Sequence, residues 1–293
     1  MFSGSFVAIA TPMQPNGAID FDAWARLIDF HIAAGTSGLV IGGTTGESAT
    51  LTDAELRALS LRAYEHAHRR LRIITGAGTS STATTAARVQ WLRELPIDGL
   101  LLVTPAYNRP SQEGLFQHFA TAATAAAGKP VLLYNVPSRT AVDLKPATAA
   151  RLSHVAGVVG LKEAVPEVAR VRELVALCAP GFTILSGDDA TAREAIGAGA
   201  RGVISVTANV APRQMSEMVA AALAGDKERA QALDAPLAAL HRDLFLEANP
   251  IPVKWLLAQM GLMPAGLRLP LTPLAEEYRA RLQAAARAGG VLT

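Results

Sequence analysis

A lysine closes a short apolar run near the middle of the chain, Val158-Val159-Gly160-Leu161-Lys162. The run predicts a buried strand, and because side chains alternate across a strand, Val158, Gly160 and Lys162 are expected on one face. Burial disfavours an ammonium and lowers its pKa, and a neutral amine can attack a carbonyl to form a Schiff base. On this run alone, a lysine that snorkels to solvent or pairs with a carboxylate explains the pattern as well.

A glycine-rich segment, Gly-Gly-Thr-Thr-Gly-Glu at residues 42–47, follows another apolar run. Its glycines let the backbone approach a ligand, and its N–H groups, with the hydroxyls of Thr44 and Thr45, can hold an anion. An ordinary turn between a strand and a helix is the alternative. The segment is neither a phosphate-binding P-loop nor a dinucleotide fingerprint, since it lacks the P-loop lysine and the glycine spacing.

Two tyrosines and an arginine complete the candidate set. Tyr134 ends an apolar run and could carry a proton to and from a carbonyl oxygen, unless it is simply a buried tyrosine. Arg139 lies five residues further on and could hold a carboxylate in a bidentate pair, unless it is a surface arginine. Tyr107 stands between two prolines on a stiff loop, which indicates either a contact with another subunit or local packing.

Metal sites and other nucleophiles find no support in the sequence. His66 and His68 are two residues apart on an expected helix and therefore diverge. Asp188-Asp189 fits a helix N-cap better than a metal pair, with Asp189 preceding a predicted helix. The only cysteine, Cys178, lies in an apolar helical pattern and is expected to pack in the core.

Short apolar runs alternate with amphipathic segments along the first three quarters of the chain. Eight such units predict a parallel sheet closed into a (β/α)8 TIM barrel over residues 1–224, with its active site at the carboxyl ends of the strands. The remainder, 225–293, predicts a C-terminal helical domain or extension. The expected strands are Phe6–Ala10, Gly38–Ile41, Arg72–Thr75, Gly99–Val103, Val131–Tyr134, Val158–Leu161, Thr183–Leu185 and Gly202–Val206. The expected helices include Phe21–Ala34, Thr52–Arg70, Ser80–Glu94, Glu113–Ala126 and Glu167–Cys178.

Composition narrows the functional class. The net charge of +2 over 293 residues gives no electrostatic footprint for nucleic acid or an anionic membrane. One cysteine permits no intrachain disulfide, which suits a reducing compartment. The start of the chain does not resemble a signal peptide, and no apolar run approaches the roughly 18 residues of a membrane span. We therefore expect a soluble, cytoplasmic protein.

Four segments together carry a family resemblance. They are Gly-Thr-Thr-Gly-Glu-Ser at 43–48, Thr-Pro-Ala-Tyr-Asn-Arg-Pro at 104–110, Tyr-Asn-Val-Pro-Ser-Arg-Thr at 134–140 and Gly-Leu-Lys-Glu at 160–163. The chain resembles, over essentially its whole length, the dihydrodipicolinate synthase family of the class I aldolases, whose superfamily includes N-acetylneuraminate lyase. The glycine-threonine motif and the lysine are common to the superfamily, whereas the segment at 134–140 is more specific to the synthases.

The resemblance implies a reaction and a set of roles. Pyruvate would form a Schiff base with Lys162, and the derived enamine would attack aspartate semialdehyde to give 4-hydroxy-tetrahydrodipicolinate on the path to lysine. No metal or organic cofactor is implied, because the lysine itself is the electron sink. The implied assembly is a homotetramer, a dimer of tight dimers. By the same resemblance, Tyr134 would transfer protons, and Thr44 would link it to Tyr107 of a neighbouring subunit. Thr45 would bind the pyruvate carboxylate, and Arg139 would guide the carboxylate of the semialdehyde. The backbones of Gly187 and Ile204 would line the pocket.

One departure from the family concerns feedback inhibition by lysine. The positions that match the family's lysine site are Ser48, Ala49, Asp53, Leu56, Ser80, Thr84 and Ala106. Neither Leu56 nor Ala106 has a side chain that can hydrogen-bond a lysine, and Thr84 lacks a carboxylate for its ammonium, although Asp53 adds one elsewhere. We predict weak or absent inhibition.

Two other functions stay open at this point. Another pyruvate-dependent aldolase of the superfamily, acting on a sugar acid or other aldehyde, would share Lys162, Tyr134 and the glycine-threonine loop, and Arg139 with the Tyr107 loop favours the synthase. A catalytically silent binding scaffold would have no use for an unpaired buried amine, which is costly in a core.

Overall fold

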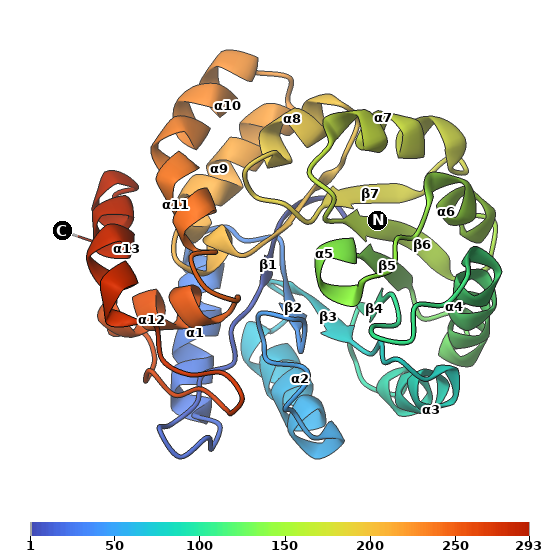
Figure 1. Ribbon diagram of the computed structural model, residues 1–293, viewed down its shortest axis with the longest axis horizontal. Helices are drawn as coiled ribbons and strands as arrows, with labels where there is room; N and C mark the ends of the chain where they lie inside the picture. The colour runs from blue at the N-terminus through green and yellow to red at the C-terminus, as the bar shows by residue number, and fades with distance from the viewer. Residues whose placement is uncertain (1, 293) are drawn as a thin grey trace.

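The computed structural model describes residues 2–292, and within them eight parallel strands close into a barrel in chain order, β1 next to β2 and on to β8, which pairs with β1 (Figure 1). The predicted barrel is therefore confirmed, and each expected strand lies within two residues of an observed one. The strands are β1 (Gly4–Ala8), β2 (Gly38–Ile41), β3 (Arg72–Gly76), β4 (Gly99–Val103), β5 (Val131–Asn135), β6 (Val158–Glu163), β7 (Thr183–Ser186) and β8 (Gly202–Ser205).

Helices connect the strands and cover the outside of the barrel, as Figure 1 shows. The second helix begins where its capping box predicts: Thr52 accepts from the backbone of Glu55, whose side chain accepts from the backbone of Thr52. The barrel helices are α1 (Phe21–Ala33), α2 (Asp53–Ala67), α3 (Thr82–Leu92), α4 (Gln112–Ala126), α5 (Pro137–Thr140), α6 (Pro146–Leu152), α7 (Val168–Leu177), α8 (Ala192–Gly197), the 3-10 turn η1 (Thr207–Asn209) and α9 (Pro212–Leu223).

The strands separate two apolar cores, because a barrel strand is buried on both faces. A small inner core fills the barrel and includes Phe6, Tyr134 and Ile204. A larger outer core lies between the strands and the helices, and includes Leu39, Leu133 and Leu161. The alternation of side chains along each strand therefore decides which residues face the inside of the barrel, and the last of these, at the carboxyl ends of the strands, lie where the active site is expected.

The alternation predicted for β6, with Val158 on the face of Lys162 and Val159 on that of Leu161, is wrong at its first two residues. Val131 pairs with Val158 but Leu132 pairs with Gly160, so a bulge leaves Val159 as an extra residue. Val158 consequently belongs to the outer core, while Val159 packs against the inner one. The expected separation of Leu161 and Lys162 onto opposite faces survives, because both lie after the bulge.

The N-cap role predicted for Asp189 is also wrong. Helix α8 starts at Ala192 with Thr191 as its N-cap residue, and no side chain caps it. The buried carboxylate of Asp189 instead accepts hydrogen bonds from the backbone N–H groups of Val206 (2.8 Å) and Thr207 (2.9 Å). It thereby ties the loop after β7 to the end of β8, a contact that local sequence patterns do not reveal.

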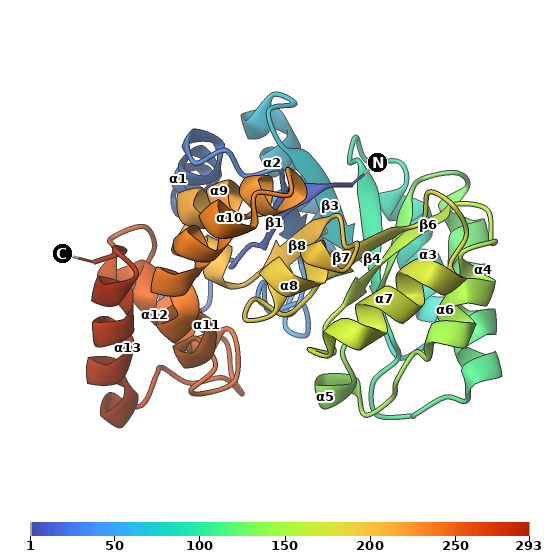
Figure 2. The ribbon, with the colours of Figure 1, turned by 90° about the horizontal axis from the view of Figure 1, so that it is seen from above.

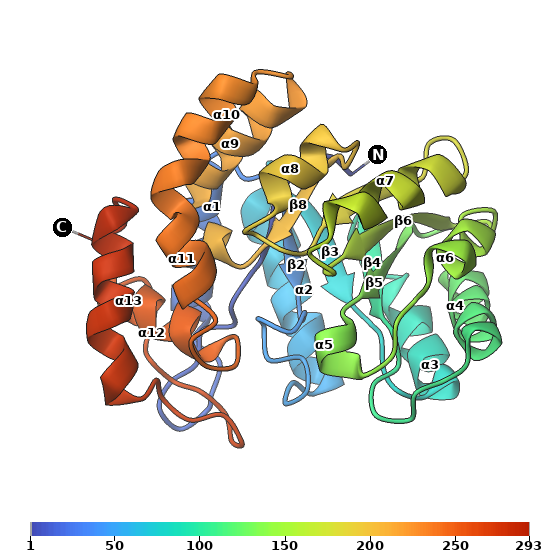
Figure 3. The ribbon, with the colours of Figure 1, turned by 45° about the horizontal axis from the view of Figure 1, so that its top comes forward.

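After α9 the chain is helical, with no further strand up to residue 292. Figures 2 and 3 show these last helices gathered along one side of the barrel, beside α1 and α9. They are α10 (Lys227–Asp234), the 3-10 turn η2 (Ala235–Leu237), α11 (Ala238–Asp243), α12 (Ile251–Gln259) and α13 (Glu276–Ala288). None of the helices in residues 2–292 is long and apolar enough to cross a membrane.

Candidate active site

Lys162 and Tyr134 face each other across neighbouring strands. They are register partners on β6 and β5, and both side chains are buried, with 5% of the lysine exposed. The ammonium nitrogen of Lys162 lies 4.4 Å from the centroid of the Tyr134 ring. Within residues 2–292, Lys162 makes no side-chain hydrogen bond or ion pair, so the amine predicted from the sequence is buried without a carboxylate partner.

Gly187 and Ile204 lie beside this pair. A Cβ atom added to Gly187 would lie 2.9 Å from Cε of Lys162 and 2.9 Å from Cβ of Ala164, closer than real Cβ contacts allow. The Gly187 N–H also donates to the carbonyl of Glu163 at 2.7 Å, which holds the loop against the strand that carries the lysine. Ile204, fully buried on β8, belongs to the same inner core as Tyr134.

The glycine-threonine loop after β2 brings Thr44 close to Tyr134. Both line a cavity of about 380 Å³ whose walls also include Gly43, Gly76 and Val103. Thr45 is buried, and its hydroxyl oxygen accepts a hydrogen bond from Nδ2 of Asn249 at 2.9 Å. Because the amide occupies one acceptor position of that oxygen, the Thr45 hydroxyl hydrogen is available for a second partner such as a carboxylate.

Glu47, the last residue of the loop motif, has a structural role that the sequence did not indicate. Its φ is 57°, a left-handed value that is uncommon for a residue with a side chain, and its carboxylate is buried. That carboxylate forms an ion pair with Lys254 and accepts from the backbone N–H of Arg268 at 3.1 Å. Lys254 is itself fully buried on α12, and burial lowers its pKa while Glu47 opposes the shift. The C-terminal segment therefore holds the loop in shape.

Arg139 stands on α5, and Figure 2 shows this short helix beyond the carboxyl ends of the strands. Its guanidinium donates to the backbone carbonyl of Asn249 at 3.2 Å, and much of the side chain is exposed. Asn249 thus contacts both Thr45 and Arg139, the two residues predicted to bind carboxylates. Sequence reasoning missed Asn249 because no local motif surrounds it, and only the fold brings the C-terminal segment to the mouth of the barrel.

Tyr107 points into solvent and is not among the walls of the cavity that Thr44 and Tyr134 line. Its side chain is 95% exposed, and its φ of 73° is left-handed. The loop around it is fixed, since Asn108 donates to the carbonyl of Ser80 at 2.8 Å and Arg109 to that of Ala141 at 3.2 Å. An ordered loop that presents an exposed ring is what a subunit contact requires, and the role of Tyr107 in a neighbouring site stays a prediction.

Five of the seven residues matched to a lysine site, Ala49 among them, line the same cavity as Thr44 and Tyr134. Ser48, Leu56, Ser80 and Ala106 are among its walls. The carboxylate of Asp53 is already paired with Arg88 at 2.7 Å. Asp53 therefore does not offer a free carboxylate for a lysine ammonium, which supports the prediction of weak inhibition.

The part of the chain that the structure describes gives little support for a metal site or a cysteine nucleophile. No cluster of three histidine, cysteine or carboxylate side chains that could hold a metal occurs between residues 2 and 292. His66 bonds Asp29 at 2.9 Å rather than meeting His68. Cys178 is half-buried at the end of α7, and burial raises the pKa of its thiol to about 11. The thiol is therefore protonated at neutral pH and is a poor nucleophile.

Comparison with known proteins gives a consistent set of relatives. The model of the Dihydrodipicolinate synthetase family matches residues 1–289. The 4-hydroxy-tetrahydrodipicolinate synthase of Methylococcus capsulatus is 50% identical over 292 residues, covering 100% of both chains. That of an Azoarcus species is 50% identical over 291 residues, covering 99% of each. The crystal structure of the chloride-inhibited dihydrodipicolinate synthase from Acinetobacter baumannii, complexed with pyruvate, matches with a TM-score of 0.98 and 45% identity over 100% of both chains.

Proposed function

The chain belongs to the dihydrodipicolinate synthetase family, and we propose that it condenses pyruvate with L-aspartate 4-semialdehyde to 4-hydroxy-tetrahydrodipicolinate. The observation that carries the proposal is full-length identity of 50% to synthases, together with a buried, unpaired Lys162 next to Tyr134. The reaction is a lyase-type condensation in the route to diaminopimelate and lysine.

Lys162 is the nucleophile in this proposal. Its neutral amine adds to the keto carbon of pyruvate, and the carbinolamine loses water to leave an imine. Loss of a proton from the methyl carbon gives an enamine, and that carbon then bonds to the aldehyde carbon of the semialdehyde. The amino group of the former semialdehyde adds to the imine carbon, which closes the ring and releases Lys162 as a free amine.

Tyr134 and the carboxylate-binding residues support these steps. The phenol of Tyr134 would carry protons to and from the carbinolamine oxygen. The support is that its ring centroid lies 4.4 Å from Nζ of Lys162 and that Thr44 lines the same cavity as Tyr134. The Thr45 hydroxyl holds the pyruvate carboxylate, and Arg139 guides the carboxylate of the semialdehyde. Gly187, which lies against Lys162, and Ile204, which shares the inner core with Tyr134, would line the substrate pocket with their backbones.

We further propose that the chain acts in the cytoplasm as a homotetramer built from two tight dimers. The support is the ordered loop that exposes Tyr107, which would complete the site of a neighbouring subunit. Residues 1–224 would then be the catalytic barrel. Residues 225–293 would form a helical domain that supports it through Lys254 and Asn249.

Borohydride reduction in the presence of pyruvate tests the proposed function. The intact protein is expected to gain one reduced pyruvate, located on Lys162 by peptide mass mapping, because the imine is the species that borohydride traps. A Lys162→Ala variant should gain none, and the unmodified protein should consume the semialdehyde with pyruvate. Absence of the adduct, or its location on another lysine, contradicts the mechanism.

A further inference from the structure

A second set of polar side chains lies directly behind Lys162 and Tyr134, on the outer face of the same two strands. Asn135 follows Tyr134, Glu163 follows Lys162, and the two are register partners at the carboxyl ends of β5 and β6. Both are buried, with 0% and 1% of their surfaces exposed. Because strand side chains alternate, they lie on the face opposite to the amine and the phenol.

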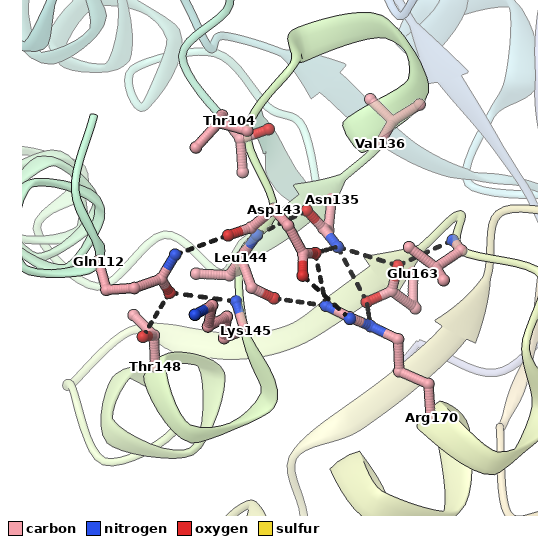
Figure 4. Close-up of polar contacts among 12 residues, drawn as sticks. Thr104, Gln112, Asn135, Val136, Asp143, Leu144, Lys145, Thr148, Glu163 and Arg170 are labelled. Atoms are coloured by element: carbon pink, nitrogen blue, oxygen red, sulfur yellow. Dashed lines mark hydrogen bonds and ion pairs between the residues drawn. The ribbon is translucent and has the colours of Figure 1, made fainter. Parts of the chain in front are cut away.

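The two side chains are joined to each other, as Figure 4 shows. Nδ2 of Asn135 donates to both carboxylate oxygens of Glu163 at 3.1 Å and to Oδ1 of Asp143 at 2.8 Å. The Oδ1 atom of Asn135 accepts from the backbone N–H of Leu144 at 2.9 Å. Glu163 also accepts from the backbone N–H of Val165 at 2.9 Å and from Nε of Arg170 at 2.9 Å. Every polar atom of Asn135 and Glu163 therefore has a partner, which fixes both rotamers.

Arg170 on α7 closes the cluster. Its guanidinium binds Glu163 through Nε and Asp143 through both terminal nitrogens, at 3.1 and 2.7 Å. It also donates to the carbonyl of Leu144 at 2.7 Å. Two carboxylates thus share one partly buried guanidinium, and the pairing is what makes burial of Glu163 tolerable.

The same cluster fixes the segment that follows α5. Asp143 and Leu144 come shortly after Arg139, and they are held from one side by Arg170 and from the other by Gln112 of α4. Gln112 donates to the carbonyl of Asp143 at 2.7 Å and accepts from the hydroxyl of Thr148 at 2.7 Å. The strands that carry Lys162 and Tyr134 and the segment that carries Arg139 are therefore locked together at one place.

We propose that Asn135 and Glu163, closed by Arg170, are positioning residues for the condensation: their bond holds the ends of β5 and β6 in the register that sets the Lys162 amine against Tyr134. Neither residue touches substrate, and both act through the residue that precedes them. This proposal rests on the proposed function, since it assigns Asn135 and Glu163 the role of supporting the Lys162–Tyr134 site. Its consequence is a loss of rate rather than of pyruvate affinity, because Thr45 lies on a different loop, held by different contacts.

The test uses an isosteric change, Asn135→Leu, in the full-length protein. We expect kcat to fall about tenfold or more, as for a small misplacement of reacting groups, and the KM for pyruvate to stay within about threefold. The rate of borohydride trapping on Lys162 should fall with kcat. A cycle with Glu163→Gln should be strongly non-additive, the double variant losing little more than the worse single variant, because the pair acts as one unit.

The matched control is Ser60→Ala. The Ser60 hydroxyl is fully buried and joins α2 to β3 through Thr75 at 3.0 Å, so its removal also breaks a buried side-chain bond of the barrel. We expect this variant to lower Tm while kcat stays within about twofold, since it touches neither β5 nor β6.

Three results overturn the proposal. The first is a folded Asn135→Leu protein that reacts at the rate of the unmodified enzyme, and the second is additive losses in the double-mutant cycle. The third is a Ser60→Ala variant that loses as much kcat for a given loss of Tm as Asn135→Leu does. If Asn135→Leu does not fold, Glu163→Gln alone decides, and an unchanged trapping rate in it contradicts the role. Failure of the unmodified protein to trap pyruvate would instead contradict the proposed function, so the two failures are distinguishable.

Discussion

Lys162 owes its position to a neighbour that lacks a side chain. Gly187 follows the end of β7, and the Cε atom of Lys162 occupies the space that a Cβ atom on this residue would need. The φ of Gly187 is not left-handed, so the requirement for glycine here is space rather than backbone conformation. Residue 187 must therefore be glycine because the side chain of Lys162, 25 positions earlier in the sequence, passes against it.

Gly187→Ala is expected to displace the side chain of Lys162. Schiff-base formation should then slow about tenfold or more, because the amine is no longer correctly positioned for attack on pyruvate. Overpacking should also lower the free energy of unfolding by about 1–3 kcal/mol. The measurements are the rate of borohydride trapping with pyruvate and denaturant unfolding. Gly197→Ala is the control, because a Cβ atom there meets nothing within 4 Å. Equal trapping rates in the two variants would show that the close approach has no functional effect.

At the scale of elements, the loop after β2 is held by a segment from the other end of the chain. Glu47 of the loop pairs with Lys254 of α12, and Arg268 binds Glu55 at the start of α2 through an ion pair and a 2.9 Å hydrogen bond. These contacts join residues more than 200 positions apart. The glutamate of the Gly-Thr-Thr-Gly-Glu motif is therefore buried and supports the loop, while Thr44 lines the cavity.

Lys254→Met leaves the Glu47 carboxylate buried without its counter-ion. We expect the free energy of unfolding to fall by about 3–5 kcal/mol, measured by denaturant titration. The KM for pyruvate should rise, because the loop that carries Thr45 loses its support. Adding Glu47→Gln to Lys254→Met should recover part of the stability, since no buried charge then lacks a partner.

Lys227→Met serves as the control, since this lysine is exposed at the start of α10. Its effect on stability should stay within about 0.5 kcal/mol. If Lys254→Met proved as harmless as Lys227→Met, the ion pair would have no part in holding the loop.

At the scale of the whole molecule, the predicted role of Tyr107 in a neighbouring subunit's site depends on how subunits associate. Thr44 and Tyr134 line one cavity, but the ring of Tyr107 points into solvent on a rigid loop. A tyrosine ring exposed to this degree leaves a large apolar area in water, and such residues are enriched where proteins meet. We therefore expect the complete site to form only when subunits associate.

Complementation between two impaired variants tests this expectation. A Lys162→Ala chain keeps Tyr107, and a Tyr107→Ala chain keeps Lys162, so a mixed dimer would hold one complete site. Unfolding and refolding the two together should restore activity beyond the sum of the separate proteins, measured as condensation rate at fixed total protein. If Tyr107 acted within its own chain, the mixture would be no more active than that sum.

Local patterns in the sequence were sufficient for the barrel and for most of the candidate site. Strand alternation, the capping box at Thr52 and the glycine-threonine run depend on neighbours within a few residues, so they can be predicted without knowledge of tertiary contacts. Alternation failed at the start of β6, where pairing with β5 introduces a bulge. Because the carboxyl ends of parallel strands meet at one rim, the sequence pattern predicts that Lys162 and Tyr134 lie together, and they are register partners on β6 and β5.

Only the tertiary structure decided what supports these residues. The bulge at Val159, the contact of Asp189 with β8, the pairing of Glu47 with Lys254 and the bonds of Asn249 all join segments distant in sequence. A buried polar group needs a partner but does not specify where along the chain that partner lies. The sequence by itself therefore determined which groups can do the chemistry, whereas the packing of remote segments determined which groups hold them in place.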